Sequence, residues 1–162
     1  MPLPKRQAVL DALIAHYTGA LGSVQAMAKL ASDEATSDET RSEGKYDTRG
    51  TEASYLARGQ AERVAGLQVA LHAARSVDPQ DRPDASIGEG RLVRTLDDED
   101  TERVLFILSA GGGATLSVRG VSVGVVSAAS PWGRSLLGNG VGDDVEVRIR
   151  GGVRSVSIEE IS

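Results

Sequence analysis

Carboxylate side chains gather between residues 32 and 52, a segment with almost nothing to bury and more acidic than basic residues. Its central charged residues are Glu43, Lys45, Asp47, Arg49 and Glu52. Carboxylate oxygens bind hard cations such as Mg²⁺, and an incomplete set of ligands can complete a metal site that belongs to a partner. The segment is therefore a candidate for approach to another protein's active centre. A solvated turn explains the same composition without any ligand.

Two stretches with helical spacing flank this charged segment. Their apolar residues recur at three- and four-residue steps, which predicts the seam of an antiparallel coiled-coil hairpin. Pairing Leu21 with Leu67 puts the midpoint at Gly44, and arms of about 35 residues at a rise of 1.5 Å would reach on the order of 50 Å. The carboxylates would thus lie at the far end of two long helices. The expected seam residues are Leu10, Leu13 or Ile14, Tyr17, Leu21, Val24, Met27 and Leu30 in the first helix and Leu56, Val64, Leu67, Leu71, Ala74 and Val77 in the second.

Four residues within the arms leave alternatives open. Gly22 and Gly66 would face each other at this register, so they either let the two backbones approach or merely weaken each helix by about 1 kcal/mol. His16 and His72 would also share one level of the hairpin. Two histidines without an obvious third ligand are expected to be ordinary surface residues rather than a metal site.

The composition narrows the class of protein. The chain has 162 residues, 40% of them hydrophobic, which suits one ordinary domain or two small ones. A net charge of −5 disfavours direct association with duplex DNA, so a role with nucleic acid would run through another protein. No apolar run is long enough to cross a membrane, and the lack of cysteine suits a reducing compartment. We therefore expect a cytoplasmic protein without a membrane partner.

The periodicity changes in the second half of the chain. Residues 79–88, in which two prolines stand among Asp and Ser, are typical of a linker between 1–78 and 89–162. After the linker the period is two, and β-branched residues lie between glycine-rich turns, as in the half-buried strand expected from Val145 to Ile149. The sequence therefore predicts an α+β protein, with a long helical hairpin followed by a β-rich domain.

Two short segments punctuate the expected strands. "SPWGRSLLG" predicts one short helix, with Ser130 as N-cap, Pro131 at the first helical position and Gly138 as the stop. "SAGGGATLS" follows the strand "VLFIL" and lacks the Gly-Lys-Ser/Thr ending of a phosphate-binding loop. We expect it to be a flexible connection.

The segment "VSAASPWGRSLLGNGVGDDVEV", from Val126 to Val147, resembles a motif near the end of Gre-type bacterial transcription elongation factors. In that family the motif has the form "ISxxSPxGRALLGKxxGDxVEV". The resemblance implies an N-terminal antiparallel coiled coil joined to a C-terminal domain with an FKBP-like fold. The matching residues are Ser130, Pro131, Gly133, Arg134, Leu136, Leu137, Gly138, Gly142, Asp143, Val145 and Val147.

The resemblance also implies a regulator of transcription rather than an enzyme. In the family, the globular domain docks at the rim of the secondary channel of RNA polymerase, and the coiled coil enters the channel. The chain would be a monomeric factor, with no cofactor of its own, that modulates initiation and elongation and meets nucleic acid only through the polymerase. In cleavage-stimulating members, acidic tip residues help to hold a Mg²⁺ ion of the polymerase active site, and here Asp47 and Glu43 would share that ion.

The tip departs from the family pattern. Cleavage-stimulating members carry a sequence like "GDLSENAEY", whereas this chain has "SEGKYDTRGTEASY". Glu43 lies four positions before Asp47 and Glu52 five after it, so neither spacing reproduces the acidic pair. We therefore expect binding to polymerase without cleavage. Stimulated Mg²⁺-dependent cleavage of backtracked transcripts is the alternative, and a coiled-coil scaffold unrelated to polymerase is the second.

The short helix is the second candidate site. The resemblance places it near the surface that grips the polymerase, so Ser130, Pro131, Trp132 and Arg134 are candidates for docking. A structural role, with Trp132 covering the sheet, explains the same residues.

Overall fold

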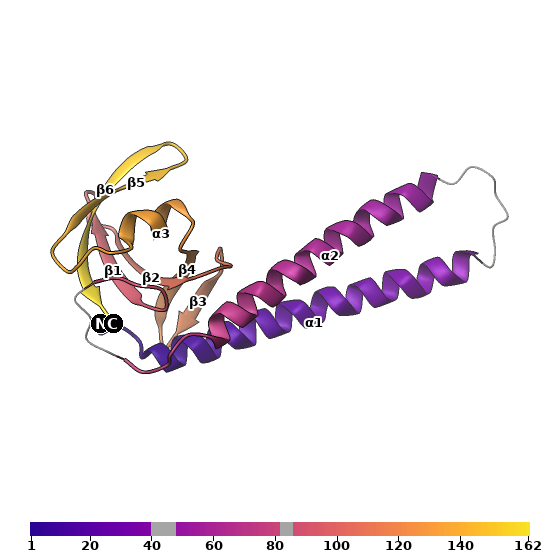
Figure 1. Ribbon diagram of the computed structural model, residues 1–162, viewed down its shortest axis with the longest axis horizontal. Helices are drawn as coiled ribbons and strands as arrows, with labels where there is room; N and C mark the ends of the chain where they lie inside the picture. The colour runs from indigo at the N-terminus through magenta and orange to yellow at the C-terminus, as the bar shows by residue number, and fades with distance from the viewer. Residues whose placement is uncertain (40–47, 82–85) are drawn as a thin grey trace.

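The computed structural model describes the backbone of residues 1–39, 48–81 and 86–162, and side chains throughout these ranges except in 35–39 and 48–54. Helices α1 (Arg6–Glu39) and α2 (Thr48–Arg75) form an antiparallel hairpin that projects from a β-rich body (Figure 1). The predicted fold class, a helical hairpin followed by a β-rich half with one short helix, is confirmed.

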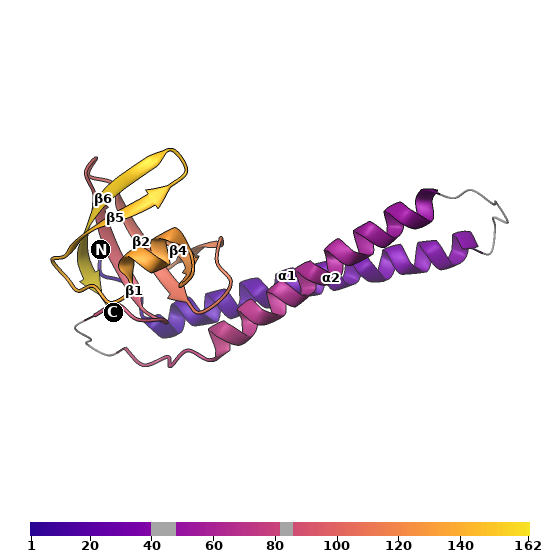
Figure 2. The ribbon, with the colours of Figure 1, turned by 45° about the horizontal axis from the view of Figure 1, so that its top comes forward.

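The seam between the two helices is buried only near the body. Met27, Leu30 and Leu56 were expected in the seam but are 63%, 64% and 69% exposed, so that part of the prediction is wrong. Figures 1 and 2 show the helices separating towards their far ends, where both arms are rich in alanine. Side chains that small cannot fill a widening space between helix axes. The buried seam residues are Leu10, Leu13, Tyr17 and Val24 of α1 and Ala70, Leu71 and Ala74 of α2.

The two helical glycines do not bring the backbones together. A Cβ atom placed on Gly22 or Gly66 would meet nothing within 4 Å beyond its own stretch of helix. Of the two interpretations, local weakening of the helices is the one that fits. His16 and His72 are both exposed, as expected of surface histidines.

Within the described part of the second half, six strands form one sheet in the order β3-β4-β2-β1-β6-β5. Only the contact between β2 and β4 is parallel. The helix α3 (Pro131–Leu136) lies between β4 and β5 in the chain and packs on the sheet. The strands are β1 (Leu92–Asp97), β2 (Glu102–Leu108), β3 (Thr115–Val118), β4 (Val121–Ser127), β5 (Asp144–Ile149) and β6 (Gly152–Ile161).

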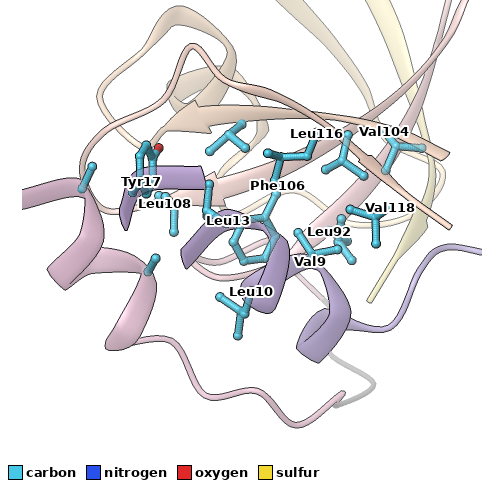
Figure 3. Packing of buried hydrophobic residues seen from close by; sticks show 14 of the residues in the cluster. Val9, Leu10, Leu13, Tyr17, Leu92, Val104, Phe106, Leu108, Leu116 and Val118 are labelled. Carbon is cyan, nitrogen blue, oxygen red and sulfur yellow. The ribbon is translucent and has the colours of Figure 1, made fainter. Parts of the chain in front are cut away.

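The central strand β2 has both faces covered, which explains its continuous apolar sequence. Val104, Phe106 and Leu108 point to one face, where they form a core with the lower ends of α1 and α2 (Figure 3). Leu105 and Ile107 point to the other face, where they pack near α3. The hairpin base and the sheet therefore share one hydrophobic core.

The boundaries 1–78, 79–88 and 89–162 stay a prediction, although the structure adds detail to the linker. Ile87 is buried, its N–H donates to the carbonyl of Asn139, and its carbonyl accepts from the N–H of Gly138. The end of the linker is thus fastened beside the C-terminus of α3. Among the described residues, no helix is both long enough and apolar enough to span a membrane.

Candidate functional site

The acidic tip of the hairpin lies largely beyond what the structure describes. Glu43, Lys45 and Asp47 fall outside the described residues. Arg49 and Glu52 belong to the first turns of α2, but their side chains are outside the description as well. Shared binding of Mg²⁺ by the tip therefore remains a prediction. Among the described side chains, no group of three or more His, Cys, Asp or Glu residues could hold a metal ion.

The start of α3 is the candidate site that the structure describes fully. The Ser130 hydroxyl accepts a hydrogen bond from the backbone N–H of Gly133 at 3.0 Å and donates one to the carbonyl of Ser127 at 2.7 Å. Pro131 follows at the first helical position. The N-cap prediction is confirmed, and both polar functions of the Ser130 hydroxyl are used to build the turn.

Trp132 and Arg134 differ in their surroundings. Trp132 is half-buried, packs against the core beneath α3, and has the Arg103 guanidinium 5.7 Å from its ring centroid. This distance is within the range of a cation–π interaction. Arg134 is exposed, as is Pro131. The four predicted docking residues thus share one helix start, at which Pro131 and Arg134 are accessible and Trp132 is partly covered.

Asp97, at the end of β1, binds two arginines, one of which lies over the Trp132 ring. Its carboxylate accepts hydrogen bonds from the Arg103 guanidinium at 2.6 Å, from the Thr101 N–H at 2.8 Å and from the Glu99 N–H at 3.1 Å. Arg154 of β6 also reaches it, at 3.3 Å. The hydrogen bond from Arg103, then those from the turn, lower the pKa of Asp97 from 3.8 to about 2. The carboxylate therefore fixes the arginine that lies on the Trp132 ring.

Sequence reasoning missed this network. A signal was available, because an aspartate at the end of a strand followed by polar residues is typical of a turn in which the carboxylate accepts from nearby N–H groups. The residues that the turn recruits, Arg103 and Arg154, could not be paired with Asp97 without the strand register.

The pKa of Asp97 predicts how stability depends on pH. Because the folded-state pKa lies below the ordinary value, the ionised carboxylate stabilises the fold above about pH 5, and this contribution is lost as pH falls towards 2. Asp97→Asn should therefore flatten the fall in the urea unfolding midpoint between those pH values. Asp98→Asn, on the same turn and exposed, should keep the wild-type dependence. Equal pH profiles for Asp97→Asn and wild type would contradict the assignment.

Comparisons with known proteins agree on one family. Residues 82–162 match the model of the C-terminal part of the transcription elongation factors GreA/GreB. Over 100 residues the chain is 35% identical to transcription elongation factor GreA of Beijerinckia indica, which covers 62% of this chain and 60% of that protein. It is 30% identical over 99 residues to GreA of Nautilia profundicola, which covers 61% and 58%. The chain thus spans less than two thirds of the length of these curated relatives.

Solved structures resemble the chain at lower similarity. Gfh1, GreA factor homolog 1, of Thermus thermophilus is 22% identical, with a TM-score of 0.38, over 93% of this chain and 95% of that one. A GreA/GreB factor from Nitrosomonas europaea is 26% identical, with a TM-score of 0.36, over 64% and 79%. The family match is the informative one, since it takes in the whole sheet, α3 and the motif around Ser130. The matched residues 82–162 make up half of the 162-residue chain, and the protein therefore belongs to the GreA/GreB family of transcription elongation factors.

Proposed function

We propose that the chain binds bacterial RNA polymerase, inserts its helical hairpin into the secondary channel and thereby modulates initiation and elongation. The observation that supports this proposal is the helical hairpin, here called the arm, which projects from the β-rich body of a GreA/GreB family member (Figure 1). With 34 residues at a rise of 1.5 Å, α1 is about 50 Å long. Only its first half is anchored in the core. A narrow arm of this length suits a cavity that excludes the body.

The β-rich body would serve as the grip on the enzyme. Pro131 and Arg134 offer an accessible contact at the start of α3, and Trp132 lies beside them with one side on the core. The Ser130 hydrogen bonds and the Asp97–Arg103 pair hold this surface in shape before a partner arrives. A preformed contact binds at lower entropic cost than one that must be ordered. Ser130 would act here by positioning its neighbours.

The tip would act by its charge. We propose that Glu43, Asp47 and Glu52, with Lys45 and Arg49, approach the polymerase active centre, and that any Mg²⁺ there is shared with the enzyme. Two carboxylates, Asp47 and Glu43, are chemically suited to such an ion. Because their spacing departs from that of cleavage-stimulating members, modulation is favoured over cleavage. The chain would not be an enzyme itself, and would work in the cytoplasm as a monomer that meets nucleic acid only through the polymerase.

Competition with a GreA protein tests the binding. A fluorescently labelled copy of the chain should bind core RNA polymerase with saturable anisotropy, and excess GreA should displace it. In backtracked complexes the chain should suppress GreA-stimulated RNA shortening as its concentration rises. Absence of binding at micromolar protein would reject the proposal and favour a scaffold unrelated to polymerase.

A single substitution separates modulation from cleavage. Relatives named transcription elongation factor GreA keep stimulated cleavage open as a second candidate. With the chain alone, we expect no RNA shortening above the polymerase's own rate in stalled complexes at saturating Mg²⁺. If shortening occurs, Asp47→Ala should abolish it and leave binding intact. Shortening that survives both Asp47→Ala and Glu43→Ala would overturn the role given to the tip carboxylates.

A further inference from the structure

The connection between β2 and β3 rests on the helical hairpin. Gly111, Gly112 and Gly113 all have positive φ angles, of 87°, 120° and 84°. Residues with a side chain rarely adopt such angles, so the run of glycines allows a backbone path that other residues would resist. The connection has no regular structure and is exposed, and its flexibility stays a prediction, but the backbone at Gly111 and Gly112 lies close to neighbouring elements.

The contact with the hairpin is closest at Gly111. A Cβ atom on this residue would lie 2.7 Å from the Cβ of Ala70 in α2 and 3.2 Å from the Tyr17 hydroxyl in α1. The neighbouring Gly112 N–H donates to the Tyr17 hydroxyl at 3.4 Å. A Cβ on Gly112 would lie 3.0 Å from the backbone nitrogen of Ser127 in β4. The backbone of this exposed loop thus lies close to both helices at Gly111 and to the sheet at Gly112.

Burial makes this contact specific. Tyr17 is 4% exposed, and burial raises the pKa of its hydroxyl, while the hydrogen bond from Gly112 opposes that rise. Ala70 is also buried. A Cβ atom on Gly111 would have no room beside the Cβ of Ala70. Small residues on both sides therefore let the loop and the hairpin approach to backbone distance.

A second contact lies nearer to the ends of the two helices. The Arg6 guanidinium donates to the carbonyl of Asp78 at 3.2 Å and also to that of Gln80, and the backbone N–H of Arg6 donates to the Asp81 carboxylate at 3.1 Å. These bonds tie the start of α1 to the chain that leaves α2. The shared core and the contact at Tyr17, in contrast, join the hairpin to the sheet.

We propose that the contact of Gly111 and Gly112 with Tyr17 and Ala70, called the socket below, sets the direction of the hairpin relative to the sheet. The arm would then point one way in the free protein, before any partner binds. This inference does not need the polymerase to be tested, but its consequence rests on the proposed function. If the arm must enter a channel while the body grips the rim, an arm already aligned binds at lower entropic cost.

Two glycine substitutions isolate the contact. Gly111→Ala and Gly113→Ala impose a similar backbone strain, since the φ angles are 87° and 84°, but only at position 111 would the new Cβ meet the hairpin. The chain contains no cysteine, so Lys29→Cys and Ser122→Cys, both at exposed positions, accept spin labels at defined sites. Lys29 lies about 18 Å beyond Tyr17 along the helix, so a tilt at the socket is amplified there.

Pulsed electron paramagnetic resonance on the free, full chain measures the label distance. We expect one narrow distance for wild type and for Gly113→Ala, and a shifted or broadened one for Gly111→Ala. Adding Ala70→Gly to Gly111→Ala removes the nearest clashing atom and should restore most of the narrow distance. Identical distributions for Gly111→Ala and Gly113→Ala would overturn the proposal.

A second variant covers the case in which Gly111→Ala does not fold. Ala70→Val adds atoms on the helix side of the same contact, and far-UV circular dichroism of the full chain checks that its helix content is kept. It should shift or broaden the distance, and an unchanged distribution would again reject the socket. Polymerase binding plays no part in these measurements, so their failure and a failure of the proposed function are distinguishable.

Discussion

Gly133→Ala is expected to lower the free energy of unfolding by about 4 kcal/mol or more, or to prevent folding altogether. A Cβ atom at this position would lie 2.1 Å from the carbonyl oxygen of Ser127 and 2.8 Å from both the Cα and the carbonyl oxygen of Ala128. All three are backbone atoms, at the end of β4 and in the turn that leads from it into α3, so no side chain can rotate to make room. The chain itself would have to move, and with it the Ser130 cap.

Gly138→Ala is the matched control for this effect. Gly138 has a φ of 82°, but a Cβ there would meet nothing within 4 Å. Gly138→Ala should therefore lower the free energy of unfolding only by the cost of backbone strain, about 1 to 2 kcal/mol. Urea unfolding followed by the fluorescence of the single tryptophan, Trp132, measures both variants. Equal losses would show that the close approach at Gly133 is not what selects glycine in this motif.

Phe106→Ala is expected to cost about 3 to 5 kcal/mol. Phe106 is fully buried in the middle of β2 and belongs to the cluster that joins the sheet to the lower hairpin (Figure 3). Its removal leaves a cavity between Leu13 of α1 and the sheet, in a core where neighbours cannot collapse freely. Tyr55→Ala removes an aromatic ring that is 70% exposed on α2 and should change stability by no more than about 0.5 kcal/mol.

The same variant tests whether the hairpin base and the sheet unfold together. Trp132 fluorescence reports on the body, whereas far-UV circular dichroism reports mainly on the helices. Because Phe106 contacts elements of both, the two transitions should coincide in wild type and shift together in Phe106→Ala. Separate midpoints, with only the fluorescence midpoint lowered, would contradict a shared core.

The features predicted correctly from the sequence are those set by local chemistry. Ser130 and Pro131 start a helix because their side chain and ring satisfy the first turn, whatever surrounds them. The strand from Asp144 to Ile149 keeps its period of two, with Val147 buried. Long helical periodicity predicted α1 and α2 and their antiparallel pairing.

The errors concern contacts between distant segments. Helical spacing alone cannot show that the arms separate beyond Val24, so it places Met27 and Leu56 in a seam that they do not join. The docking of Gly111 depends on Ala70, 41 positions away in the sequence but 2.7 Å from its Cβ position. From the sequence alone, a run of glycines predicts a flexible backbone. Only the fold shows that the positive φ angles of these glycines bring the backbone close to the hairpin.

A photocrosslinking amino acid in place of Tyr55 tests most directly whether the hairpin enters the secondary channel, because this exposed residue lies on the distal half of the arm. We predict crosslinks from this position to the walls of the secondary channel of bacterial RNA polymerase, and their loss when excess GreA is added. A second probe at Arg150, exposed on the body, should crosslink only outside the channel. Crosslinks from Tyr55 confined to the outer surface of the enzyme, or no crosslink from either position, would contradict insertion of the hairpin.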